Sequence, residues 1–155
     1  MEIHGYKSFN GDGTNNAGIV MPPGIYHCDG DIIYQRNGFH FARNLEDTLR
    51  YRTIEDGEPL IAEVIGRGTI VESNRYEDIE YYGYYGLYAA SDMEIVRYLT
   101  HEEIVEYALK LVDRTGIKRI LASQILTEED IKMIVKENST YENYLNYYPK
   151  VYIKR

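Results

Sequence analysis

A chain of 155 residues is long enough to bury one hydrophobic core, so the sequence predicts one globular unit. Its formal net charge of −8 disfavours binding to nucleic acid, because clustered Lys and Arg make most of the affinity for a phosphate backbone. No segment approaches the run of about 18 apolar residues that predicts a membrane span, and Met1-Glu2-Ile3-His4 does not begin a signal peptide.

Cysteine content bears on the compartment. Cys28 is the single cysteine, so no disulfide can form within the chain and a zinc site made of several thiolates is excluded. We therefore expect a cytoplasmic protein that contacts neither membrane nor nucleic acid.

The chain up to about residue 99 is expected to be mainly β-structure. Near alternation of apolar and polar residues predicts a strand over 2–9, and residues 10–16 are dense in turn formers. Residues 25–28 and 32–34, joined at Asp29-Gly30, predict a β-hairpin. Further strands are expected over 39–42, 60–66, 69–71 and 93–99.

A short helix is expected between the strands over 39–42 and 60–66. Asn44, followed three residues later by Asp47, is typical of a helix N-cap with acidic residues in the first turn. Leu45 and Leu49 are four residues apart, so they would share one face of that helix and point to the core.

Two capping boxes predict helices in the last third of the chain. They are Thr100-His101-Glu102-Glu103 and Thr127-Glu128-Glu129-Asp130. The apolar stripe of the first helix runs to Val112, and Gly116 is a suitable residue just beyond its end. The second helix should extend through Val135.

The order of elements predicts the fold class. Strands followed by helices indicate an α+β fold, with mostly antiparallel strands and a short central helix over 1–99 and a packed helical segment over 100–155. In that segment four tyrosines have the spacing of one helical stripe that docks on the body of the protein and ends before Pro149. They are Tyr141, Tyr144, Tyr147 and Tyr148.

Simple metal and nucleotide motifs are not supported. Asn10, Asp12 and Thr14 alternate like the start of a calcium loop, but the twelfth position of that loop is Met21. His27-Cys28-Asp29 with His40 could suggest a metal site, yet neighbouring residues of a strand point to opposite faces. We therefore expect no metal.

Several residues in and after the strand over 39–42 follow the order of a known motif. The order Gly38-Phe39-His40-Phe41-Ala42, then Thr48, then Tyr51, resembles the central motif of the poly(ADP-ribose) polymerase and diphtheria-toxin-like ADP-ribosyltransferases. His4-Gly5 on the first strand is similar to the first motif of that superfamily. Residues 60–66 are similar to its apolar strand ending in Glu-Val-x-x-Gly.

This resemblance implies an ADP-ribosyltransferase-like body over residues 4 to about 98 that uses NAD as its substrate. It implies that Tyr51 and His40 stack on the nicotinamide, that Thr48 holds the nicotinamide amide, and that His4-Gly5 contacts the adenosine-side ribose. A flat ring that carries an amide suits an apolar slot with stacking faces and a few fixed polar groups.

The catalytic assignment implied by the resemblance is Glu94 together with His4. Glu94 would polarise the 2′-hydroxyl of the nicotinamide ribose, with Asp92 and Glu80 as alternatives, and a fixed carboxylate would stabilise the cationic ribosyl centre. His40 stands where the superfamily has a tyrosine, and the late glutamate has no unambiguous counterpart. A chain without that glutamate would bind the nucleotide and transfer nothing.

The sequence leaves two alternative functions open. The first is an NAD-dependent ADP-ribosyltransferase or NAD glycohydrolase. The second is a non-catalytic domain that engages a host or target protein through its acidic face or its tyrosine clusters, Tyr81 to Tyr88 and Tyr141 to Tyr152. The chain also resembles an uncharacterised family of phage and bacterial domains with a Gly-Phe-His-Phe motif, which implies a mobile-element origin and no chemistry.

The motif residues also have a purely structural interpretation. Phe39 and Phe41 would share one core face, Tyr51 would pack under the helix, and Thr48 would be an ordinary helix residue. His4 would then be a strand histidine. Fold-level analogy alone does not decide between these interpretations.

Overall fold

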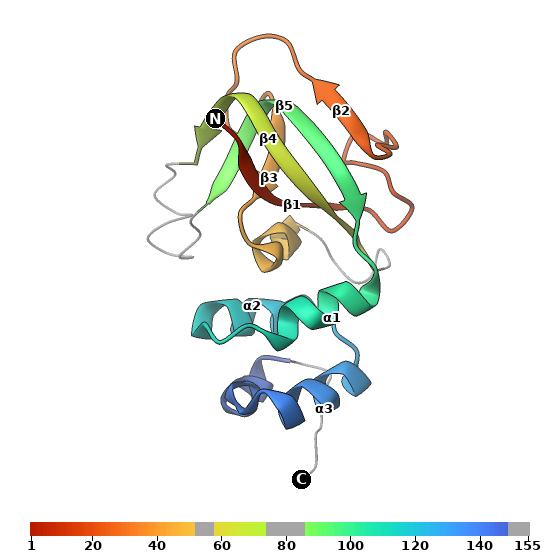
Figure 1. Ribbon diagram of the computed structural model, residues 1–155, viewed down its shortest axis with the longest axis vertical. Helices are drawn as coiled ribbons and strands as arrows, with labels where there is room; N and C mark the ends of the chain where they lie inside the picture. The colour runs from red at the N-terminus through yellow and green to blue at the C-terminus, as the bar shows by residue number, and fades with distance from the viewer. Residues whose placement is uncertain (52–57, 74–85, 149–155) are drawn as a thin grey trace.

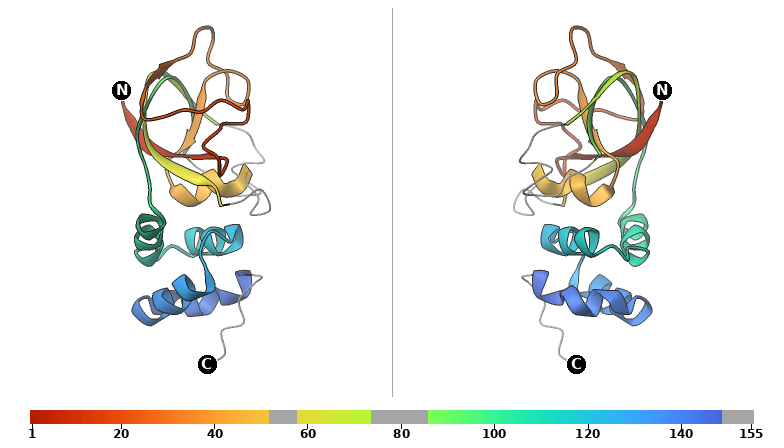
Figure 2. Two further views of the ribbon diagram at one scale, coloured as in Figure 1. Left: turned by 90° about the vertical axis from the view of Figure 1, so that its right-hand side faces the viewer. Right: turned by 90° about the vertical axis from the view of Figure 1, so that its left-hand side faces the viewer.

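The computed structural model describes residues 1–51, 58–73 and 86–148, and it places a β-barrel above a stack of short helices (Figure 1). The strands come first in the chain and the helices follow, so the α+β class is confirmed at this level. Figure 2 shows the same layering from two sides, with the barrel at one end and the last helices at the other.

The described strands are all antiparallel to their neighbours, and four of them close a barrel. β5 pairs with both β3 and β4, and β1 joins β3 to β4 on the other side. β2 is added to the outside of this ring through β5 alone. The strands are β1 (Ile3–Phe9), β2 (Gly24–His27), β3 (Phe39–Ala42), β4 (Leu60–Glu72) and β5 (Leu87–Tyr98).

The predicted hairpin over 25–34 is wrong. β2 pairs with β5, while residues 33–37 form a tight turn closed by an antiparallel bridge between Ile33 and Asn37. Pairing with β5 places Tyr26 opposite Met93, whose side chain is fully buried. Long-range pairing with β5 therefore outweighs the local turn signal at Asp29-Gly30.

The strands predicted over 60–66 and 69–71 are one strand, β4. Its pairing with β5 shifts register between Arg67 and Ile70, and Gly68 has a φ of +74° there. The glycine marks an irregularity within the ladder rather than a turn between strands. β5 likewise begins at Leu87, earlier than the sequence pattern indicates.

Aromatic packing fixes the barrel interior. Phe41 points inward from β3 and stacks on Tyr88, with ring centroids 5.3 Å apart. A Cβ at position 66 would lie 2.4 Å from Phe41 Cζ, so the ring occupies the space that Gly66 leaves free. The glycine in the motif-like run over 60–66 therefore has a packing role.

The central helix exists, but it is a 3-10 helix, η1 (Leu45–Tyr51), and Asn44 does not cap it through its side-chain oxygen. The Asn44 carbonyl oxygen accepts from the Asp47 amide at 3.2 Å, and the Asn44 side-chain amide donates to the Asp47 carboxylate at 3.3 Å. Leu45 and Leu49 are buried as predicted.

Both predicted capping boxes are confirmed. Thr100 caps α1 (His101–Leu109) and Thr127 caps α3 (Glu128–Glu137). The predicted end of the first helix is wrong, because Val112 is exposed and Gly116 lies in the first turn of a separate helix, α2 (Arg114–Ser123). Its N-cap is Asp113, which accepts from the Gly116 amide at 2.9 Å.

The tyrosine-rich tail docks on the protein, but the predicted stripe is confirmed only in part, because Tyr147 is 41% exposed. It forms η4 (Ser139–Tyr147), in which Tyr141 is fully buried and its hydroxyl donates to the Ala108 carbonyl oxygen. Tyr148 is also buried and donates to the Leu126 carbonyl oxygen at 2.7 Å.

One hydrophobic cluster joins the barrel to the helices. Leu45 and Leu49 from η1 and Ile61 from β4 pack in the same cluster as the buried residues of the helical segment. That cluster includes Ile104, Ile117, Leu121, Ile131 and Ile134. The underside of the barrel is therefore covered by helices, which leaves its flank and far end to form sites.

Candidate functional site

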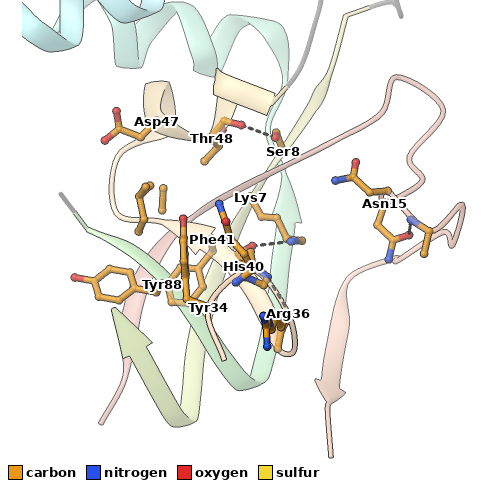
Figure 3. Close-up of a pocket in the computed structure, with 16 residues that line it drawn as sticks. Lys7, Ser8, Asn15, Tyr34, Arg36, His40, Phe41, Asp47, Thr48 and Tyr88 are labelled. Carbon is orange, nitrogen blue, oxygen red and sulfur yellow. Dashed lines mark hydrogen bonds between the residues drawn. The ribbon is translucent and has the colours of Figure 1, made fainter. Parts of the chain in front are cut away.

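A cavity of about 540 Å³ lies on the flank of the barrel, and we call it the β3–η1 cavity (Figure 3). Its walls come from the end of β1, the loop at 15–17, the turn at 34–36, β3, η1 and the start of β5. The side chains used below are Lys7, Ser8, Tyr34, Arg36, His40 and Thr48. Two motif residues, His40 and Thr48, thus line one space.

His40 lies on the face of β3 opposite to Phe39 and Phe41, because side chains alternate along a strand. Its Nε2 accepts from the Gln35 amide, and its Nδ1 lies 3.2 Å from the Gly38 carbonyl oxygen. Burial lowers the pKa of His40, and the nearby Lys7 charge lowers it further. Acceptance at Nε2 fits a ring with its proton on Nδ1, and both nitrogens are engaged within the protein.

The backbone around His40 depends on two unusual conformations. Gly38 has a φ of +120°, and a Cβ there would approach Ile32 Cγ2 at 3.1 Å. Gln35 has a φ of +67° in the 33–37 turn, a left-handed conformation that is uncommon outside glycine. This turn points the Gln35 amide at His40 and sets Tyr34 over it, with ring centroids 5.2 Å apart.

Hydroxyl groups form the η1 side of the cavity. The Thr48 hydroxyl donates to the Leu45 carbonyl oxygen at 2.8 Å, and the Ser8 hydroxyl donates to the Thr48 carbonyl oxygen at 2.7 Å. Since a hydroxyl oxygen keeps acceptor capacity after it donates, Thr48 can still accept from a ligand N–H group.

Two cations lie at the cavity. The Lys7 ammonium donates to the His40 carbonyl oxygen at 2.6 Å, and Arg36 is exposed on the turn at 34–36. The wall formed by the start of β5 contains Tyr88, whose hydroxyl accepts from the Arg43 guanidinium. The cavity therefore combines aromatic surface with positive charge.

His4-Gly5 lies elsewhere. His4 pairs with Ile65 of β4, its side chain is 72% exposed, and it does not line the β3–η1 cavity. A Cβ on Gly5 would lie 2.3 Å from the Ala42 carbonyl oxygen. This glycine allows β1 and β3 to approach one another, which is a structural role.

Glu94 lies near His4 on the outer face of the barrel rather than in the cavity. Ile65 pairs with His4 on one side and with Glu94 on the other, so the two residues flank it about 10 Å apart by strand spacing. Glu94 forms an ion pair with Arg67 at 2.8 Å, and Arg67 also bonds Glu2 at 2.7 Å. The structure thus separates the implied catalytic pair from the implied ring-binding residues.

Of the other implied residues, Tyr51 ends η1 but its side chain lies outside the described residues, as does Glu80. Asp92, the remaining alternative to Glu94, bonds His27 Nδ1 at 2.8 Å, and Asp29 bonds His27 Nε2 at 2.8 Å. Hydrogen bonds to Asp92 and Asp29 raise the pKa of His27. This cluster also lies away from the cavity.

Sequence reasoning missed a buried polar cluster beneath η1. Asp47 is 2% exposed and bonds Arg119 of α2 at 2.7 Å, while Glu46 accepts from the Tyr107 hydroxyl of α1 at 2.8 Å. Burial raises the pKa of Glu46. The cluster connects the barrel to the helices, whereas the sequence pattern predicts only that acidic residues such as Asp47 lie in the first turn of a helix.

Among the described residues, no group of three or more His, Cys, Asp or Glu side chains is placed to hold a metal ion. No helix within the described ranges is long and apolar enough to cross a membrane. Comparison with family models, curated proteins and solved structures gives no match to this chain. Its function is therefore argued from its own geometry.

Proposed function

We propose that this chain binds a nucleotide of the NAD class in the β3–η1 cavity and does not transfer its ADP-ribose. The observation that carries this proposal is that His40 and Thr48, two residues of the ADP-ribosyltransferase-like motif, line one cavity with Lys7 and Arg36. Its volume of about 540 Å³ lies in the usual range for ligand pockets, roughly 300–1,000 Å³.

Each end of such a ligand has a chemical counterpart at the cavity. The Tyr34 and His40 rings offer apolar surface to a flat heterocycle, and Thr48 Oγ1 can accept from the amide of a nicotinamide. Arg36 and Lys7 supply positive charge for a pyrophosphate. His40 acts through its ring surface, because both of its nitrogens are engaged within the protein.

The proposal excludes transfer because, among the described residues, the implied acids Glu94 and Asp92 lie outside the cavity, and Asp47, which lines it, is held by Arg119 at 2.7 Å. Polarising a ribose hydroxyl requires a carboxylate within hydrogen-bond reach of that hydroxyl. Glu94 and His4 lie on the outer face, and Arg67 engages Glu94 at 2.8 Å. Bound NAD would therefore remain intact, and the protein would act as a binding or sensing module.

Isothermal titration with NAD, combined with a nicotinamide-release assay, tests both parts. We expect wild-type protein to bind NAD and R36A to bind on the order of 10-fold more weakly, because one charge-assisted contact is lost. T48V should also weaken binding, while H4A and E94Q should match wild type. No heat with wild type would contradict the binding proposal, and nicotinamide release by wild type would contradict the absence of transfer.

A further inference from the structure

A second feature, independent of the β3–η1 cavity, is an apolar strip that leads into β2. Ile19, Val20 and Ile25 are 58%, 61% and 77% exposed, and Pro22-Pro23 lies between them. Scattered exposed apolar residues are ordinary, but several within seven consecutive residues mark an interaction site or a liability to aggregate. β2 and this strip lie on the outside of the barrel in Figure 1.

β2 has one open edge. It is the terminal strand of the sheet, and within the described ranges only β5 pairs with it. The Cys28 amide donates to the Ser91 carbonyl oxygen at 2.8 Å, so Tyr26 and Gly24 are the residues that exchange ladder bonds with β5. The backbone N–H and C=O groups of Ile25 and His27 consequently face away from β5.

Acidic side chains lie at the end of this edge. The Asp29 side chain is 97% exposed and bonds His27, and Asp31 is exposed two residues further on. Asp92 lies on the other side of the His27 ring, at 2.8 Å. Ile25 and His27 share one face of β2, so the apolar side chain of Ile25 and the His27 ring, which bonds Asp29 and Asp92, are two residues apart along the edge.

From the open edge, the apolar strip and these carboxylates we infer that β2 is a docking site for an extended basic segment of a partner protein, which adds a strand beside Ile25 and His27. Main-chain bonds to the outward groups of β2 give the affinity in this mode of recognition, and alternate side chains give the specificity. The segment carries an apolar residue opposite Ile25 and a Lys or Arg two residues along, where it meets Asp29.

A basic partner is favoured over a second copy of this chain. Two copies joined through β2 would bring together two molecules of net charge −8, each with exposed carboxylates at Asp29 and Asp31. Four residues form a short edge, and Pro22-Pro23 prevents its extension toward the N-terminus. A short charged edge resists self-association while it remains open to a complementary strand.

The test uses a fluorescein-labelled peptide of Val-Thr-Lys-Thr repeats, which places valine and lysine two residues apart on one face of a strand, and a matched peptide in which glutamate replaces lysine. Fluorescence anisotropy should show saturable binding of the lysine peptide to the full chain and none of the glutamate peptide. D29N should weaken binding several-fold, and added salt should weaken it as well. Hydrogen exchange should slow at the Ile25 and His27 amides when the peptide is bound.

A variant that blocks the open edge of β2 distinguishes main-chain pairing with the peptide from non-specific electrostatic attraction. I25P removes an outward amide that makes no ladder bond to β5, so we expect circular dichroism like that of wild type and peptide binding at least 10-fold weaker. I25V should bind like wild type and controls for the change of side chain, and exchange protection at Ile25 and His27 tests the pairing if I25P fails to fold. Equal binding of both peptides, exchange protection away from β2, or a dimer through β2 without peptide would overturn the inference.

Discussion

Gly5 on β1 approaches the carbonyl oxygen of Ala42 on β3 so closely that a Cβ at position 5 would lie 2.3 Å from that oxygen. β1 carries Lys7 and Ser8 to the β3–η1 cavity, and β3 carries His40 there. This close approach of two backbones therefore sets the geometry of the candidate site, although Gly5 itself does not line it.

G5A should destabilise the protein. The added methyl group would overlap backbone atoms, which must move apart, and overpacking of this kind typically costs about 1–3 kcal/mol. Urea denaturation measures the loss. H4A is the matched control, because its exposed side chain should contribute less than about 0.5 kcal/mol. Equal stability of G5A and wild type would show that the strands do not approach as described.

R119M should destabilise the protein more strongly. It removes a guanidinium that lies 2.7 Å from Asp47, whose side chain is almost fully buried. Removing one partner of a buried ion pair costs about 3–5 kcal/mol. Thermal unfolding of R119M, D47N and the double variant measures the coupling, and the double variant should recover part of the loss. Additive effects would argue against a direct interaction.

E46Q should alter the pH dependence of stability. Burial raises the pKa of Glu46 above its ordinary value of 4.5, so the folded state favours the neutral carboxyl. Stability should therefore fall as pH rises from about 4.5 through the raised pKa, and E46Q should reduce that fall. Denaturation at a series of pH values tests this, and a steeper fall in E46Q would contradict it.

His101 should make a second contribution to the pH dependence of stability. It bonds Glu58 at 2.6 Å and Asp130 at 2.7 Å, which ties α1 to α3 and to the residues before β4. Burial opposes the charged form, but hydrogen bonds to Asp130 and Glu58 outweigh it and raise the pKa of His101 above 6.5. Its contribution is fully present below about pH 6.5 and is lost as pH rises through the raised pKa.

Melting temperatures of wild type and H101Q between about pH 6 and 9 measure this contribution. Wild type should lose more stability than H101Q as pH rises. His27 also has a raised pKa and titrates in the same direction, so the difference between the two proteins is the quantity to compare. Parallel pH profiles would show that His101 does not hold the helices to the barrel.

Local signals predicted several elements well. The capping boxes at Thr100 and Thr127 and the apolar pair Leu45 and Leu49 depend on residues three or four apart, so the pattern alone determines them. The hairpin over 25–34 failed because the partner of β2 is β5, far away in sequence. Pairing across such distances has no local signature.

The candidate site was predictable only in part. His40 and Thr48 follow one another in a strand-to-helix junction, so their convergence could be expected from short-range geometry. The pairing of His4 with Ile65, and of Ile65 with Glu94, depends on barrel closure. Lys7 and Arg36 belong to no motif in the sequence. They line the site only because β1 and the 33–37 turn meet at β3.

Amide chemical shifts in labelled protein titrated with NAD test the central claim most directly. We predict that NAD shifts the amides of Lys7, Arg36, His40 and Thr48, which surround the β3–η1 cavity, and leaves those of His4 and Glu94 unchanged. Shifts confined to the outer face around His4, Ile65 and Glu94, or no shifts at millimolar NAD, would contradict the account.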